Sequence, residues 1–347
     1  MWWILTLLRS ADCHVTLFPF DRQPRQPYTG QLQRAGIEVR HGEESFASFA
    51  GHRRDSYSLV ILSRPGVAFA LLDDTRRFFP GATVVYDSVD LESVRSARKL
   101  GLLNELDAQQ VEWERARELD CVRRSDIVSV VTNADAEQIH RHLPSARTLA
   151  LPNVHAVDPA MPKAFDERAD LLFIGGFRHD PNVDAVRYFA REIFPLIRTQ
   201  IDARLVVLGS NPPEEIRALD SSEVQVTGYL ADVEDYFRSA RVFVAPLRYG
   251  SGMKGKIGHA MSFGLPIATT TVGAEGMGLE DGVHALIRDT PVEFAEAVVR
   301  AYCDRETWET LSRNSRRLVG EVWAPQVMAK RLERLLAIAA RLPTVGD

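Results

Sequence analysis

Lysine is scarce in this chain, and so is cysteine. Five lysines stand against 37 arginines, so arginine supplies almost all of the basic character. The three cysteines, Cys13, Cys121 and Cys303, are far apart and lack CxxC spacing. This odd number without such spacing argues against a disulfide framework and against a zinc site. It favours thiols that stay reduced in a reducing compartment.

Long apolar runs are missing as well, and neither sign of charge is in large excess. No stretch approaches the length of a membrane-spanning helix. The opening residues 2–8 lack a basic segment and a small-residue cleavage site, which argues against a signal peptide. A net charge of -5, without interleaved basic and aromatic residues, argues against nucleic acid as a partner. We expect a cytoplasmic protein, and contact with the inner membrane face stays open.

The length and composition are those of a soluble protein with two ordinary domains. A chain of 347 residues can bury two cores, and 45% hydrophobic and 26% charged residues are typical of globular chains. In the second half, apolar runs alternate with amphipathic segments. The predicted strands are 171–174, 205–208, 224–226, 242–245 and 266–269. The predicted helices are 182–194, broken or kinked by Pro195, then 213–219, 233–240 and 257–263. Strands with few polar positions between helices indicate a parallel sheet covered on both faces.

The first half repeats this alternation less regularly. Its predicted strands are 15–18, 59–62, 83–86 and 127–131, and a long charged helix is expected over 106–122. We therefore predict an α/β protein of two doubly wound Rossmann-like domains facing a cleft. The expected parts are a first domain 1–152, a proline-containing linker 153–167, a second domain 168–323, and a C-terminal helix 324–347 packing back toward the first domain.

Two of the five lysines lie in one glycine-rich stretch, residues 250–256, just before a predicted helix. Glycines let backbone N–H groups approach an anion, and a helix N-terminus favours negative charge. Lys254 and Lys256 would add compact positive charges there. Glycine also follows other predicted strands, and carboxyl-end loops of a parallel sheet meet at one edge. The spacing is neither a P-loop nor GxGxxG, so it favours a mononucleotide diphosphate over a dinucleotide. A plain surface turn with two solvated lysines is the alternative.

Three segments together resemble one enzyme family. They are residues 173–185 (FIGGFRHDPNVDA), 244–266 (VAPLRYGSGMKGKIGHAMSFGLP) and 86–91 (YDSVDL). These segments are similar to the GT-B glycosyltransferases, specifically glycosyltransferase family 4, over most of residues 59–323. The resemblance implies transfer of a sugar from a nucleoside diphosphate sugar with retention at the anomeric carbon, without a metal or other cofactor. The acceptor would be a glycan, a lipid-linked molecule or a small molecule.

This chain departs from the family pattern at three points. Ser251 and His259 stand where the family has two glutamates with seven residues between them, and Glu92 stands where a histidine is usual. The family's opening strand and its glycine loop are not found, so we expect a first domain that lacks its first strand. Its sheet should have an exposed edge or a rearranged start, which invites additional domains or another chain.

The candidate residues follow from the strand ends and from the resemblance. Lys256, Lys254 and Arg178 are the candidate catalytic cations, because they can stabilise the charge that grows on a departing diphosphate. The donor-binding candidates are Gly175, Gly176, Gly209, Gly228, Tyr229, Ser251, Gly252, Met253, His259 and Glu275. The acceptor-side candidates are Asp87, Asp90 and Glu92. No residues are assigned to a metal. Because no carboxylate matches a nucleophile's position, front-side departure and attack is preferred over double displacement.

Two other functions stay open. A nucleotide-sugar epimerase of related two-domain shape would alter the sugar without releasing the nucleotide. A catalytically weak binding module of a larger glycan-assembly protein would bind the donor without turnover. The nucleotide base, the sugar and the acceptor are not fixed by the sequence, because loops set them on a shared fold.

Overall fold

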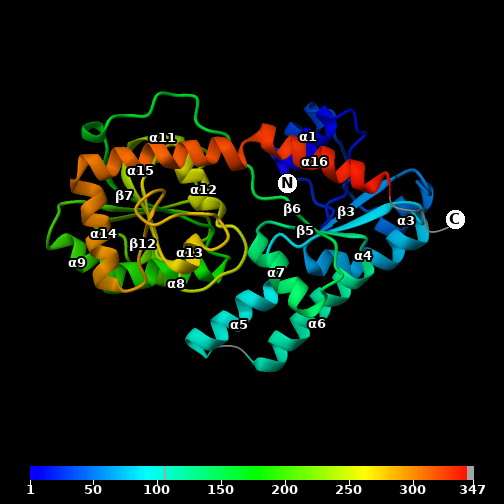
Figure 1. The fold of residues 1–347 in the computed structure, drawn as a ribbon, viewed down its shortest axis with the longest axis horizontal. Coiled ribbons are helices and arrows are strands. Elements are labelled where there is room, and N and C mark those ends of the chain that lie inside the picture. The colour runs from blue at the N-terminus through cyan, green and yellow to red at the C-terminus, as the bar shows by residue number, and fades with distance from the viewer. Residues whose placement is uncertain (105–106, 342–347) are drawn as a thin grey trace. The chain divides into compact units, whose positions relative to one another are not determined.

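The computed structural model describes residues 1–104 and 107–341, which form two compact units (Figure 1). Unit 1 comprises residues 1–93, 107–154 and 325–341, and unit 2 comprises residues 94–104 and 155–324. We expected residues 94–104 in the first domain, whereas their contacts assign them to unit 2. Leu106, the predicted start of the long charged helix, and residues 342–347 of the predicted C-terminal segment lie outside the described residues.

Unit 1 alternates strands with helices. Its strands are β1 (Thr16–Leu17), β2 (Glu38–Val39), β3 (Leu59–Ser63), β4 (Thr83–Asp87), β5 (Ile127–Val130) and β6 (Thr148–Ala150). Its helices are α1 (Trp2–Ser10), α2 (Tyr28–Arg34), α3 (Phe46–His52), α4 (Pro65–Phe78), α6 (Ala108–Arg124), α7 (Asn133–His142) and α16 (Pro325–Ala339). Helix α5 (Glu92–Leu103) begins in unit 1 and continues in unit 2.

The strands of unit 1 form two separate parallel sheets. β3, β4, β5 and β6 pair in that order, and β1 pairs only with β2. Among the described residues, the second edge of β3 therefore carries no strand. β3 is also less buried than β4 and β5, which are buried along their whole length. This agrees with the expected exposed edge or rearranged start.

The C-terminal helix α16 packs beside α1 in unit 1 (Figure 1). Leu5 and Leu8 of α1 share one apolar core with Met328, Leu332 and Leu335 of α16. The three residues of α16 recur at helical spacing, so they lie on one face of that helix. Burying this face stabilises the helix, because an isolated helix of this size is only marginally stable in water.

Unit 2 is built in the same alternating way. Its strands are β7 (Ala169–Ile174), β8 (Leu205–Leu208), β9 (Val224–Gly228), β10 (Ala240–Ala245), β11 (Ile267–Thr269) and β12 (Leu286–Ile287). Its helices are η1 (Phe165–Glu167), α8 (Asp180–Tyr188), η2 (Phe189–Ile193), α9 (Phe194–Arg198), α10 (Glu214–Arg217), α11 (Glu234–Ser239), α12 (Gly255–Ser262), α13 (Thr271–Ala274), α14 (Pro291–Cys303), α15 (Arg305–Leu318) and η3 (Val319–Trp323).

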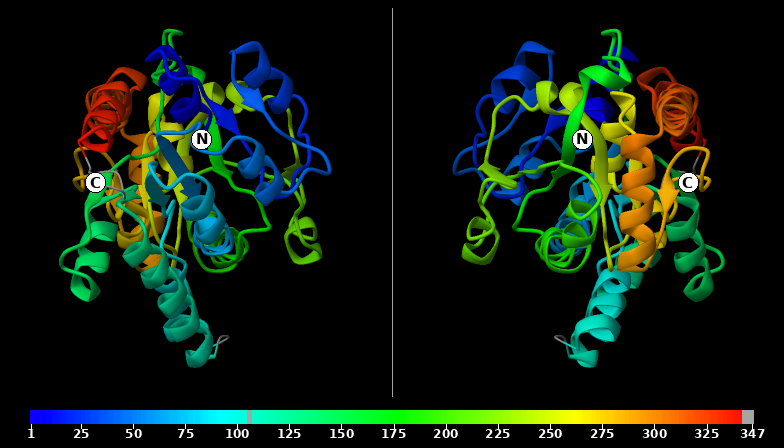
Figure 2. Two further views of the ribbon diagram at one scale, coloured as in Figure 1. Left: turned by 90° about the vertical axis from the view of Figure 1, so that its right-hand side faces the viewer. Right: turned by 90° about the vertical axis from the view of Figure 1, so that its left-hand side faces the viewer.

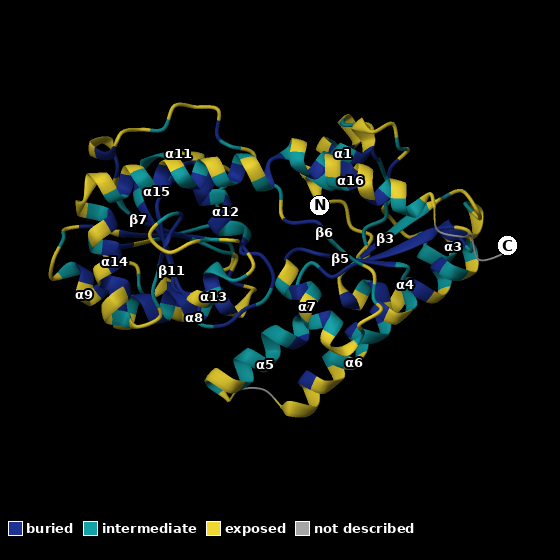
Figure 3. Ribbon diagram, viewed as in Figure 1, coloured by how far each residue is buried: buried dark blue, intermediate teal, exposed yellow. Residues whose placement is uncertain are grey.

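The six strands of unit 2 form one parallel sheet in the order β12-β11-β10-β7-β8-β9. Side chains alternate across it, as strand geometry requires. Val242 and Val244 of β10 join the core that includes residues of α8 and α14, while Phe243 stacks on Phe237 of α11. Figure 2 shows α14, in orange, alongside the strands, and Figure 3 shows the strands dark blue beneath their helices. The sheet is covered on both faces, as the sequence predicts.

The predicted break at Pro195 takes a specific form. The helix predicted over 182–194 is α8, and its C-terminal end passes through the π-helical turn η2 into the short helix α9. Pro195 lies in the first turn of α9, where its missing N–H costs no hydrogen bond. None of the described helices is long and apolar enough to span a membrane.

Candidate functional site

The strand order of unit 2 defines where a ligand is expected. The chain leaves β7 for β8 and β9 on one side, and then crosses to β10 on the other side of β7. In open parallel sheets, ligands bind at the carboxyl ends of the strands where the order reverses in this way. At this switch point lie the loop 175–179 after β7 and the loop 246–254 after β10.

The glycines of the neighbouring loops allow close backbone packing. Gly175 and Phe177 donate backbone hydrogen bonds to the carbonyls of Leu208 and Ser210, at 2.9 and 3.0 Å. A Cβ at Gly209 would lie 2.0 Å from the Gly175 carbonyl oxygen, so no larger residue fits there. Gly209 in turn donates to the carbonyl of Gly228, at 3.1 Å. These three glycines therefore shape the edge of the sheet. Gly176 is exposed and free to face a ligand.

The glycine-rich loop after β10 is held by three charged groups. Gly250 and Gly252 have positive φ values of 155° and 66°. Lys254 is buried, and its Nζ donates to the Gly252 carbonyl at 2.9 Å and lies 3.9 Å from Glu275. Arg98 of α5 donates to both Glu275 carboxylate oxygens, at 2.6 and 2.7 Å, and to the Gly250 carbonyl at 2.7 Å. Lys254 thus supports the loop's shape, and Arg98 holds the pKa of Glu275 below its ordinary value.

Lys256, in the first turn of α12, has different surroundings. Its Nζ donates to Oδ1 of Asn182 and lies 4.6 Å from the centroid of the Phe173 ring. Both neighbours are neutral, and Lys256 has no ion-pair partner among the described residues. Burial lowers the pKa of the Lys256 ammonium to about 7. A cation that has lost hydration and has no counter-charge is prepared to receive an anion.

The other donor-side candidates of the sequence are distributed around this point. Met253 is buried and Ser251 is half-buried in the loop before α12, whereas the Tyr229 side chain is 65% exposed after β9. Arg178, after β7, is exposed and has no ion pair or hydrogen bond within the described chain.

His259 lies one turn beyond Lys256 on α12, between aromatic rings. Its ring is 4.6 Å from that of Phe237 and 5.2 Å from that of Phe263, edge-on in both cases. Burial lowers the pKa of His259, and that of the nearby His155 to about 4, so both are neutral at pH 7. His155 packs directly on α12, where a Cβ at Gly258 would lie 2.5 Å from its ring. His259 is thus a neutral, partly apolar group.

Sequence reasoning missed the residues that support these loops. Asn182 of α8 contacts Lys256, and Arg98 of α5 contacts the glycine-rich loop at Gly250. The buried Asp184 of α8 pairs with Arg248, which follows β10 and stacks over Tyr188. The position of Arg248 shortly after a predicted strand is a sequence signal by which it could have been identified. The partners on helices carried no local signal, because only the tertiary fold brings them to the loop.

The three acceptor-side acids lie at or after the end of β4 in unit 1, and each has partners. Asp87 is buried and accepts hydrogen bonds from Ser63 and Ser129, at 2.8 and 2.7 Å, which ties β3, β4 and β5 together. Glu92 accepts from Arg117 at 2.6 Å. Asp90 lies 3.5 Å from Arg64, whose side chain is largely exposed.

The turn that carries Asp90 has a strained backbone. Val89 has a φ of 61° and Arg64, after β3, has a φ of 78°. A β-branched residue in this region is sterically unfavourable, and such strain is found more often at functional sites than elsewhere. The strained turn therefore marks the carboxyl end of β4 as a second region of interest in unit 1.

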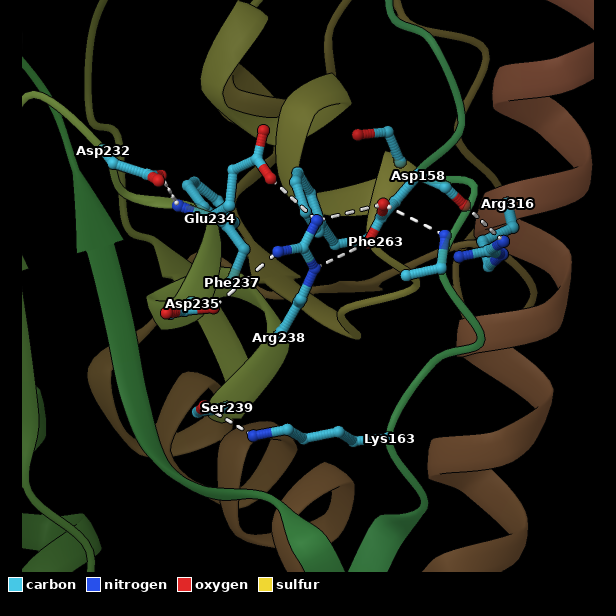
Figure 4. Close-up of polar contacts among 12 residues, drawn as sticks. Asp158, Lys163, Asp232, Glu234, Asp235, Phe237, Arg238, Ser239, Phe263 and Arg316 are labelled. Carbon is cyan, nitrogen blue, oxygen red and sulfur yellow. Dashed lines mark hydrogen bonds and ion pairs between the residues drawn. The ribbon is translucent and has the colours of Figure 1, made fainter.

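A separate network anchors the segment before β7 within unit 2 (Figure 4). Asp158 is buried and accepts from Nε and Nη2 of Arg238, at 3.0 and 3.2 Å, and its backbone carbonyl accepts from Arg316 at 3.0 Å. Lys163 donates to Ser239 at 3.1 Å. These contacts join residues 158–163 of the predicted linker to α11 and α15.

Comparison with known proteins gives a family match in unit 2. Residues 168–304, less than half of the chain, match the model of the glycosyl transferases group 1. The chain is also similar to the protein named putative glycosyltransferase YtcC of Bacillus subtilis (strain 168). The two are 31% identical over 104 residues, which is 29% of this chain and 26% of YtcC. The match therefore spans about a quarter of that protein.

Two solved structures resemble nearly the whole chain. Sucrose-phosphate synthase (tll1590) from Thermosynechococcus elongatus has a TM-score of 0.75 and 16% identity, over 96% of this chain and 90% of that one. HepE (Alr3699) of Anabaena, in complex with UDP and glucose, has a TM-score of 0.74 and 12% identity, over 97% and 95%. At these identities the likeness establishes the fold alone. The chain has the GT-B glycosyltransferase fold, and its second unit matches the glycosyl transferases group 1.

Proposed function

We propose that the protein is a retaining glycosyltransferase that uses a nucleoside diphosphate sugar as its donor. The observation that carries the proposal is Lys256, a half-buried cation with only neutral partners among the described residues, in the first turn of α12 at the switch point of the sheet. The family match of residues 168–304 and the GT-B fold support it. HepE is described in complex with UDP and glucose, so UDP-sugars are the first donors to test.

The proposed chemistry needs charge stabilisation more than covalent help. The bond between the anomeric carbon and the diphosphate oxygen breaks, and negative charge grows on the diphosphate. Lys256 and the N-terminal N–H groups of α12 stabilise that charge, with the exposed Arg178 as a third group at the same sheet edge. An acceptor hydroxyl oxygen bonds to the anomeric carbon from the same face, and its proton passes to the departing phosphate. No metal takes part in this proposal.

The acceptor in this proposal is a glycan, a lipid-linked molecule or a small molecule. From unit 1 we propose Asp90 as an acceptor contact, because it lies next to Val89 in the strained turn at the carboxyl end of β4. Asp87 supports the turn through its two serine contacts. We place the reaction in the cytoplasm, beside the inner membrane face where lipid-linked acceptors would be found.

Nucleotide release from UDP-, GDP- and ADP-sugars, measured with and without EDTA, tests the function. We expect release from at least one donor, unchanged by EDTA, and its loss in Lys256→Ala. A change in the sugar without nucleotide release would instead select an epimerase. Donor binding without turnover, in the presence of candidate acceptors, would select a binding module.

A further inference from the structure

Asn182, in the first turn of α8, joins the two loops of the switch point. Its side chain is buried, with 4% of the residue exposed. Its Nδ2 donates to the Gly176 carbonyl at 2.7 Å, and its Oδ1 accepts from Nζ of Lys256. The Asn182 amide also fills the space in which a Cβ of Gly175 would lie, at 2.6 Å from Cγ. One amide therefore links the loop after β7 to the first turn of α12.

The orientation of this amide is fixed by chemistry. The Gly176 carbonyl can only accept, so the NH₂ end of Asn182 must face it and the oxygen end must face Lys256. An asparagine thus fits both contacts, while an aspartate would set its carboxylate against the Gly176 carbonyl. The amide also leaves the positive charge of Lys256 uncompensated.

The two aspartates nearest to Asn182 in the sequence are engaged in other ion pairs. Asp180 and Asp184, on the same helix as Asn182, pair with Lys99 and with Arg248. Phe173 offers only its ring face to the Lys256 ammonium. Burial alone accounts for the lowered pKa of Lys256, and no charged neighbour contributes to it.

We propose that Asn182 is a positioning residue that holds the Lys256 ammonium, as an uncompensated cation, toward the diphosphate of the donor. The proposal rests on the proposed function. Asn182 acts through Lys256 and does not itself touch the substrate. It keeps the lysine in place without pairing it with a carboxylate, so the ammonium can pair with the anion when the anion binds. Because the same amide holds the Gly176 carbonyl, the two loops are fixed relative to one another.

The test measures binding by calorimetric titration with UDP, and with inorganic pyrophosphate as a base-free probe, from pH 6 to 9. Asn182→Ala should weaken both by about tenfold or more at pH 7, as expected when a charged group loses a hydrogen bond. In a Lys256→Ala background the same substitution should cost little, because contacting residues that act together are not additive. Equal losses in both backgrounds would overturn the proposal.

Asn182→Asp separates positioning from a purely structural role. The carboxylate places a negative charge beside Lys256, so the lysine stays protonated to higher pH. We expect the fall in pyrophosphate affinity above neutral pH to move upward by one unit or more. An unmoved midpoint in a folded Asn182→Asp variant would overturn the proposal, because a structural role alone predicts no shift.

Asn314→Ala is the matched control, since Asn314 also donates one side-chain hydrogen bond to a backbone carbonyl in unit 2, that of Val283 at 3.0 Å. It should leave the affinity and its pH dependence unchanged. If the unaltered protein binds neither UDP, GDP, ADP nor pyrophosphate, the proposed function itself fails. If it binds them and both Asn182 variants behave like the unaltered protein, only the role of Asn182 is wrong.

Discussion

Arg168 and Lys256 of unit 2 both lack a carboxylate partner among the described residues, and their surroundings differ. Arg168, just before β7, is 1% exposed and donates to the carbonyls of Lys163, Phe237, Ala240 and Phe263, at 3.1 to 3.3 Å. Lys256 has one amide oxygen and one aromatic ring. Burial lowers the pKa of both, that of Arg168 to about 10 and that of Lys256 to about 7.

The difference separates a structural cation from a ligand-binding one. Arginine carries five donors in a planar fork, and the four carbonyls around Arg168 use that capacity. The ammonium of Lys256 has three donors and one hydrogen-bond acceptor, Oδ1 of Asn182, so it retains capacity for an anion. A buried charge whose donors are satisfied stabilises the fold, while one left partly unsatisfied at a strand end indicates a binding site.

Of the effects that this difference between Arg168 and Lys256 predicts, the largest is a loss of stability when Arg168 is replaced. Arg168→Met should lower the free energy of unfolding by about 3–5 kcal/mol, because it leaves several buried carbonyls without donors. Urea unfolding followed by tryptophan fluorescence measures this. The exposed Arg178→Met, as control, should change stability by less than about 0.5 kcal/mol. Similar values for the two variants would contradict the structural role of Arg168.

A smaller effect, on binding and not on folding, is expected at Lys256. Lys256→Ala should weaken nucleoside diphosphate binding by about 1.5–3 kcal/mol, as for a charge-assisted hydrogen bond. Lys254→Ala should cost less, because the Lys254 ammonium is turned to the Gly252 carbonyl and Glu275. Calorimetric titration of both variants decides this. Unchanged affinity in the doubly substituted lysine variant would remove the donor site from this loop.

The pH dependence of the binding affinity should report the protonation of Lys256. Above pH 7 the free Lys256 loses its proton, and a bound anion raises its pKa again, so binding takes up a proton. Affinity should therefore fall as pH rises from 7 to 8.5, by at most about tenfold per unit. Calorimetric titrations in two buffers that differ in ionisation enthalpy give the number of protons taken up on binding. Lys256→Arg should be flat over this range, and a flat profile in the unaltered protein would refute the assignment.

The smallest effect is expected at His259. His259→Glu should leave pyrophosphate binding intact and tighten nucleoside diphosphate binding, because a carboxylate accepts from two ribose hydroxyls. The gain should be limited to about 1 kcal/mol, since Phe237 and Phe263 desolvate the new charge. The ratio of the two affinities measures the effect. A loss of pyrophosphate affinity of the same size would show that the substitution disturbs α12 instead.

Much of the fold could be predicted from local pattern. The apolar runs of β7, β8 and β10 are nearly continuous, as both-face burial requires, and they were recognised within two residues. The glycine-rich stretch 250–256 could be recognised because lysine is rare elsewhere in the chain and glycine is dense there. The pair α14 and α15 and the continuation of α5 into unit 2 were not predicted. The α5 segment mixes small, charged and apolar residues, so its place depends on which unit its side chains contact.

The sequence by itself determined the alternation of strands and helices, the glycine positions after strands and the presence of two lysines before a helix. These are local properties, set by backbone geometry and by side-chain burial over a few residues. Only the tertiary structure decided which lysine supports the loop and which is left without a counter-charge. That distinction depends on Asn182, Glu275 and Arg98, which are far from the lysines in the sequence and reach them only once the sheet has formed.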